Sequence, residues 1–168
     1  MPDHWTASYA ERAKRQYQDK KTEEKLLLHR RAVVESKIDS IWENLKESIS
    51  EDVSAYNATV SDFPELVIEL KSEPSKPYLW VINNLPSNSS LHCVLERKAY
   101  QLSCQYYFGG TTNQIPANRR ILVFEADNAN QVMLSTASDG AQMAHVFDNL
   151  ASVSRALIVP ILTGGWRD

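Results

Sequence analysis

Apolar and polar residues alternate with a period of two through residues 65–136, and this pattern restricts the fold more than any other feature of the chain. Successive side chains of a β-strand point to opposite faces of a sheet, so short alternating segments separated by polar breaks predict strands joined by turns. The breaks divide this region into five to six short strands. Because short connections favour antiparallel neighbours, we expect one antiparallel β-meander.

The parity of the inward-facing residues changes after the third predicted strand. Leu91, Cys93 and Leu95 share one face of that strand, whereas the inward residues from Tyr100 onward have even numbers. A strand cannot change faces without a break, so the change predicts a turn near Arg97 and Lys98, with Leu95 opposite Tyr100. Neither turn residue is glycine or asparagine, which leaves a bulge within one long bent strand as the alternative.

Apolar residues at steps of three and four on both sides of the sheet region predict helices over residues 22–58 and 139–163. Thr22 is the expected N-cap of the first helix, although an earlier start is the alternative, and Ser138 or Asp139 that of the second. Residues 1–21 are expected to form a polar, partly frayed segment. We therefore predict one α+β domain over residues 22–168: a long N-terminal helix, an antiparallel β-meander of five to six strands and a C-terminal helix packed on the sheet.

Composition argues against several classes of partner. The 18 Lys and Arg residues and 21 Asp and Glu residues give a formal charge of −3, so no overall positive field attracts nucleic acid or an anionic membrane. No run of apolar residues is long enough to span a bilayer. Cys93 and Cys104 are too few for the disulfide framework of a small secreted domain. We expect a cytoplasmic protein.

Reactive residues do not form any pattern that identifies a catalyst. The four histidines lack the spacing of metal sites, and the usual nucleotide-binding and nucleophile motifs are absent from the sequence. His92 and Cys93 are neighbours on one predicted strand and point to opposite faces, while Cys104 is expected to be buried with Cys93. We assign no catalytic residue, no cofactor and no metal ligand, and an enzyme of unrecognised type is the third choice.

The face of the sheet that the helices leave uncovered is the best candidate site in the sequence. Its mixture of side chains is too apolar for plain surface and too polar for a core, which suits a partner surface or a shallow ligand site. Its expected members are Val67, Glu69, Leu79, Val81, His92, Val94, Gln101, Ser103, Gln105, Tyr107 and Met133. The candidate partner or ligand surface consists of Tyr107, His92, Gln105, Gln101, Val94 and Trp80.

Charge is distributed unevenly along the predicted long helix. Residues 11–31 hold eight Lys or Arg against four Asp or Glu, and an acidic row follows at Glu35, Asp39, Glu43, Glu47 and Glu51. This order opposes the helix macrodipole, so helix stability does not account for it. Antiparallel association of two copies is one explanation, and a solvated outer face is the plain alternative.

These patterns indicate a non-enzymatic protein-interaction module that associates with itself, through the long helix or through the second face of the sheet. The alternative is a small-molecule-binding domain with its pocket between the sheet and the C-terminal helix. In that case residues 108–118, the longest irregular stretch in the sheet region, would gate the pocket.

Overall fold

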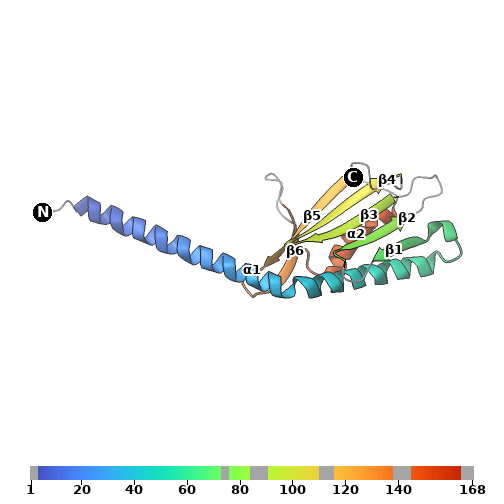
Figure 1. The fold of residues 1–168 in the computed structure, drawn as a ribbon, viewed down its shortest axis with the longest axis horizontal. Coiled ribbons are helices and arrows are strands. Elements are labelled where there is room, and N and C mark those ends of the chain that lie inside the picture. The colour runs from blue at the N-terminus through green and yellow to red at the C-terminus, as the bar shows by residue number, and fades with distance from the viewer. Residues whose placement is uncertain (1–3, 73–75, 84–90, 110–115, 138–144, 164–168) are drawn as a thin grey trace.

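The computed structural model describes residues 4–72, 76–83, 91–109, 116–137 and 145–163. The architecture is α+β, as predicted, with a long N-terminal helix, an antiparallel sheet and a C-terminal helix packed on the sheet (Figure 1). The elements in chain order are α1 (His4–Thr59), the short 3₁₀ helix η1 (Pro64–Leu66), β1 (Ile68–Ser72), β2 (Tyr78–Asn83), β3 (Leu91–Lys98), β4 (Gln101–Phe108), β5 (Asn118–Ala126), β6 (Val132–Thr136) and α2 (Leu150–Leu162).

The six strands follow one another across the sheet in chain order, and each neighbouring pair is antiparallel. The turn between β3 and β4 lies later than the sequence predicted: Ala99 and Tyr100 form it, and Leu95 faces Cys104 rather than Tyr100. Ala99 has φ of 44°, a left-handed conformation uncommon outside glycine. Because the register moved by an even number of residues, each side chain of β4 keeps its predicted face.

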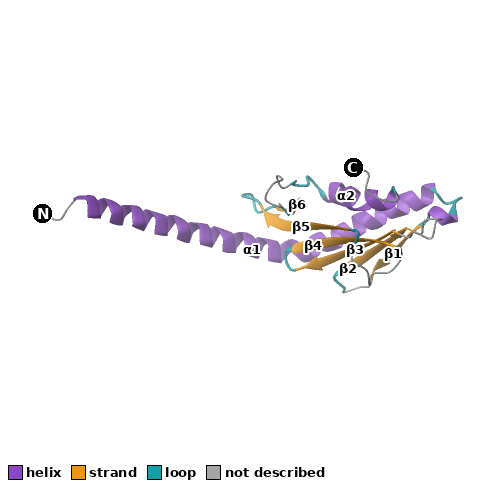
Figure 2. Cartoon of the chain, turned by 90° about the horizontal axis from the view of Figure 1, so that it is seen from above, coloured by secondary structure: helices purple, strands orange, loops and turns teal. Residues whose placement is uncertain are grey.

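Both helices cover the same face of the sheet, which we call the inner face (Figure 2). The Ser154 hydroxyl of α2 donates to the Asp52 carboxylate of α1 at 2.5 Å, so the helices also contact each other. The main residues of this core are Val34, Ile38, Trp42, Leu45, Ile49 and Val53 from α1, Leu79, Val81, Leu91, Cys93, Leu95, Leu102, Cys104, Tyr106, Leu122, Phe124 and Leu134 from the sheet, and Val153, Leu157, Ile158 and Ile161 from α2.

Helix α1 begins at His4, whereas the sequence analysis placed its start at Thr22. The Thr22 hydroxyl donates to the Gln18 carbonyl at 2.9 Å from within the helix, so Thr22 does not cap it. Neither glycine nor proline occurs between His4 and Thr59, so nothing in this stretch breaks the helix. The segment predicted to be polar therefore supplies the first turns of α1.

The chain before α2 is extended rather than helical. Val146 and Phe147 fit the spacing of the predicted helix, but Val146 instead forms an isolated bridge with Ser135 of β6. The Phe147 amide donates to the Leu134 carbonyl at 2.9 Å. Phe147 is buried and Val146 is exposed, as the alternation of an extended segment requires.

Helix α2 starts at Leu150, later than the predicted residue 139, because Asn149 provides the N-cap. Its side-chain oxygen accepts a hydrogen bond from the Ser152 amide at 2.8 Å, which satisfies one of the free amides of the first turn. The caps predicted at Ser138 and Asp139 lie outside the described residues.

Hydrogen bonds at both ends of the packed part of α1 hold it against the sheet. At one end, the β5–β6 turn contacts the helix: Asn130 Oδ1 lies 3.1 Å from His29 Nε2, and the Asn130 carbonyl accepts from Lys37 Nζ at 2.8 Å. At the other end, the Asn57 side chain makes two bonds of 2.8 Å with the backbone of Ile68. Residues 5–29 extend past the first anchor as a rod, which we call the projecting half of α1 (Figure 1).

Candidate functional site

The six residues chosen from the sequence as a candidate surface all lie on the face of the sheet opposite the core, which we call the outer face. The register pairs His92 with Tyr107, and Val94 with both Trp80 and Gln105. Gln101 occupies the same face at the start of β4, opposite Lys98. Neither described helix packs on this face.

Leu79 and Val81 were assigned to the outer face, and this assignment was wrong. Both side chains are buried on the inner face, 3% and 1% exposed. The apolar run of β2 gives no alternation that fixes its phase, and the register shows that Trp80 and Ile82 are its outward residues.

Three apolar residues of the outer face were missed in the sequence. Ile82 lies opposite His92, and Ile121 and Val123 of β5 lie opposite Ser103 and Gln101. The signal was present in β5, where Leu122 and Phe124 are buried and the residues between them must therefore face the other way.

Polar groups in the middle of the outer face are bonded to one another. The Tyr107 hydroxyl donates to Gln105 Oε1, and Gln105 Nε2 lies 3.4 Å from Ser103 Oγ. These three β4 side chains form a row that satisfies much of its own hydrogen-bonding capacity. Such a row can lie against an apolar surface at little cost, because fewer polar groups lose a partner.

Two ion pairs lie near the edges of the outer face. Lys71 and Glu69 form an ion pair of 3.2 Å on the edge strand β1, and Lys98 and Glu96 form one of 2.7 Å at the end of β3. A centre of uncharged side chains with ion pairs near the edge resembles the composition of a protein–protein interface, whose core is depleted in charge.

His92 is the titratable group near the middle of the outer face. Burial, followed by the nearby Lys71 ammonium, lowers its pKa, while Glu69 opposes the shift. Its buried Nδ1 atom has no hydrogen-bond partner among the described residues. Burial and the Lys71 charge therefore both favour the neutral imidazole.

Cys93 and Cys104 are both fully buried on the inner face, so the predicted separation from His92 is confirmed. Burial raises the pKa of Cys93 to about 12 and also raises that of Cys104. A thiol with a raised pKa is a poor nucleophile at neutral pH because the thiolate is the reactive form. Both cysteines are part of the hydrophobic core.

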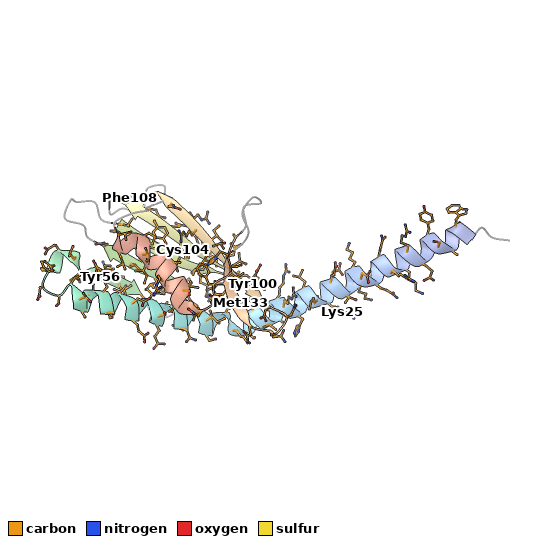
Figure 3. All side chains as sticks on the ribbon, turned by 180° about the vertical axis from the view of Figure 1, so that it is seen from behind. Lys25, Tyr56, Tyr100, Cys104, Phe108 and Met133 are labelled. Carbon is orange, nitrogen blue, oxygen red and sulfur yellow. The ribbon has the colours of Figure 1, made fainter. Side chains whose placement is uncertain are left out.

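The projecting half of α1 is a second candidate surface. Every side chain from Trp5 to His29 is exposed, and Figure 3 shows the part of α1 around Lys25 extending away from the sheet. The large hydrophobic residues among them are Trp5, Tyr9, Tyr17, Leu26, Leu27 and Leu28, between 47% and 68% exposed. Trp5 packs edge-to-face on Tyr9, with 5.9 Å between ring centroids.

An open hollow of about 410 Å³ lies where the projecting half meets the sheet. Leu27, Arg30 and Arg31 of α1 line one side, and Val123 to Ala126 of β5 and Tyr100 line the other. The pocket expected from the sequence was between the sheet and α2, and it stays a prediction. The Tyr106 hydroxyl donates to the Leu157 carbonyl at 3.0 Å there. Of the loop proposed to gate that pocket, residues 110–115 lie outside the described part.

Comparisons with protein-family models, curated proteins and solved structures found no match to this chain. Within the described residues, no three His, Cys, Asp or Glu side chains are arranged to hold a metal ion. No described helix combines the length and apolar character needed to cross a bilayer. Function must therefore be argued from the outer face, the projecting half of α1 and the hollow between them.

Proposed function

We propose that this chain is a non-enzymatic protein-interaction module that associates with a second copy of itself, with the projecting half of α1 as the binding element. The observation that carries the proposal is the exposure of every side chain from Trp5 to His29. These 25 residues extend for about 37 Å at 1.5 Å per residue. Most helical stability in proteins comes from tertiary packing, which these residues lack, so a partner would stabilise them.

The side of α1 that packs on the sheet continues into the projecting half, where it carries Tyr9 and Leu27 with the polar residues Gln16, Lys20 and Glu23 between them. Tyr9, Leu27 and Leu45 follow one another at intervals of about five helical turns, so they lie on one side of α1. Leu45 is completely buried, while Leu27 is 51% exposed and Tyr9 65%. The same side of the helix is thus covered in one half and uncovered in the other, which favours a protein partner.

The outer face of the sheet is the less favoured surface for association. Ile82, Ser103 and Tyr107 are already buried there within one chain, at 6%, 3% and 7% exposure. Covering them again removes little further area from water, so a partner gains less here than on the projecting half.

Sedimentation velocity over a range of concentrations from about 1 to 500 μM tests self-association, and hydrogen–deuterium exchange locates it. We expect the mass to rise with concentration and the amides of residues 5–29 to exchange more slowly in the associated state. A constant monomer mass, with these amides exchanging equally fast at every concentration, would contradict the proposal.

Trp80→Ala separates the two surfaces, with Val159→Ser on the exposed side of α2 as the matched control. If the helix carries association, both variants keep the dissociation constant of the parent chain within about twofold. A rise of tenfold or more for Trp80→Ala alone would move the interface to the outer face, because large aromatic residues dominate interface energies.

Binding of a small anionic amphiphile is the second candidate function, favoured by the hollow between α1 and β5. Arg30 and Arg31 supply positive charge, and Leu27 and Val123 supply apolar wall. A fatty acid should then raise the unfolding temperature of the parent chain but not of Arg30→Gln/Arg31→Gln. Equal melting of the two chains with ligand would remove this candidate.

We also propose that the protein acts in the cytoplasm. Cys93 and Cys104 are free thiols in the core, which suits a reducing compartment. A fusion to a fluorescent protein, imaged in the source cell, checks this.

A further inference from the structure

A line of exposed residues along α1 carries positive charge in its first part and negative charge in its second. The line is distinct from the residues that pack on the sheet, and its members recur at steps of three, four or seven, as one side of a helix requires. We call it the charge line: Lys14, Lys21, Lys25, Leu28, Ala32, Ser36, Asp39, Glu43 and Glu47.

The order of these charges has no explanation within one helix. The helix dipole acts mainly within the first and last turns, and the charge line lies outside both, so the dipole gives no reason for this order. Lys21 and Lys25 are four residues apart, as are Asp39, Glu43 and Glu47, so like charges also face each other along the helix. If a partner helix carried the reverse order, each of these charges would face an opposite charge, and attraction between the chains would offset the repulsion within the helix.

A second copy of α1 running in the opposite direction has that reverse order. Helix α1 extends from His4 to Thr59, and Ala32 lies at its middle. When two copies are related by a two-fold axis at Ala32, Lys21 of one faces Glu43 of the other and Lys25 faces Asp39. Each pair occurs twice, because an interface with two-fold symmetry uses the same patch on both copies.

The centre of the charge line suits close approach of two helices. Ala32 meets Ala32 of the second copy at the axis, and Leu28 lies against Ser36. Small side chains at a crossing allow helix axes to come together, and Leu28, 64% exposed in one chain, gains cover. The β5–β6 turn bonds α1 at His29 and Lys37, which are not members of the charge line.

We propose that two copies of this chain pair through the charge lines of their α1 helices, antiparallel about Ala32. This inference rests on the proposed self-association and specifies its geometry. Lys25 is labelled on the projecting half in Figure 3 and belongs to the line, whereas Tyr9 and Leu27 lie on another side of the helix. Binding through the charge line and binding through the side that carries Tyr9 and Leu27 can therefore be separated by mutation.

The acidic half of the line is available for these pairs. The Asp39 and Glu43 side chains are 81% and 66% exposed, although Asp39 bonds Arg97 at 2.9 Å and Glu43 bonds Lys46 at 2.8 Å. A carboxylate can accept from two cations at once, so neither contact has to break. Because exposed ion pairs are individually weak and screened by salt, the dimer should weaken as ionic strength rises.

A charge exchange tests the pairing. Lys21→Glu/Lys25→Glu places acid against acid, and Asp39→Lys/Glu43→Lys places base against base, so each variant alone should dissociate at least tenfold more readily than the parent chain. Mixed together, the two variants restore opposite charges at all four contacts and should form a heterodimer of parent-like affinity. The matched control is Arg12→Glu/Arg15→Glu, which makes the same change of charge off the line and should dimerise within about threefold of the parent.

Association is measured by sedimentation at about 50 mM and 500 mM salt, and folding by circular dichroism. Because Asp39 also bonds Arg97, the single variants Lys21→Glu and Glu43→Lys are measured in the same way and keep the test valid if the double variant unfolds. Recovery of dimer on mixing supports the pairing. Failure to recover it while the parent associates overturns the pairing alone, and a parent that stays monomeric at both salt concentrations overturns the proposed self-association as well.

Discussion

His92 connects the protonation of one side chain with the stability of the whole chain. Its pKa in the folded protein is lowered by burial and then by Lys71, so the unfolded chain binds a proton more readily than the folded chain. When the unfolded state binds more protons, the free energy of unfolding rises with pH. Folding therefore weakens as the pH falls through the ordinary histidine value of about 6.5.

Urea unfolding at pH values from about 5 to 8 measures this dependence. Replacing His92 with Gln should flatten the curve in the range where histidine titrates. An equal slope in the parent and the His92→Gln variant would show that burial of this imidazole does not control the pH dependence.

Single residues also show where the sequence was sufficient to predict which face of the sheet a side chain occupies. Cys93, Cys104 and His92 were placed on their correct faces because alternation alone decides orientation along a strand. Leu79 and Val81 were not, since an apolar run has two equivalent phases. The position of the β3–β4 turn was not predictable from Ala99, because alanine carries no preference for the positive φ that it adopts here.

Helix α1 presents the same side to two environments, and one pair of substitutions compares them. Leu45→Ala removes a completely buried side chain and should lower the free energy of unfolding by about 2–5 kcal/mol. Leu27→Ala changes an exposed residue five turns earlier and should change it by less than about 0.5 kcal/mol in the monomer. Urea denaturation at low concentration measures both, and a large loss for Leu27→Ala would mean that the projecting half packs on the domain.

The order of the elements followed from periodicity, whereas their ends did not. Helix α1 was extended by residues with too few hydrophobes to show a stripe, and α2 was shortened because Val146 and Phe147 satisfy both helical spacing and strand alternation. The outer face was recognisable as a surface because strand phase is local. Whether a partner covers it depends on a second molecule, about which one chain carries only indirect signals such as the order of charges on α1.

The outline of the whole molecule changes in a specific way if two α1 helices pair about Ala32. The 56 residues of α1 are about 84 Å long. Because Ala32 is at the middle, the partner helix covers the same length, and the mass doubles while the longest dimension of the helical part stays near 84 Å. Small-angle scattering at low and high concentration should show this, and a dimer much longer than the monomer would indicate end-to-end contact of the projecting halves instead.

The absence of glycine and proline from α1 has a mechanical consequence. Because α1 has no hinge, a partner that binds its amino-terminal end near Trp5 fixes the orientation of the sheet as well as its distance. In a pair of chains, the angle between the two sheets is therefore set by the contact between the two α1 helices.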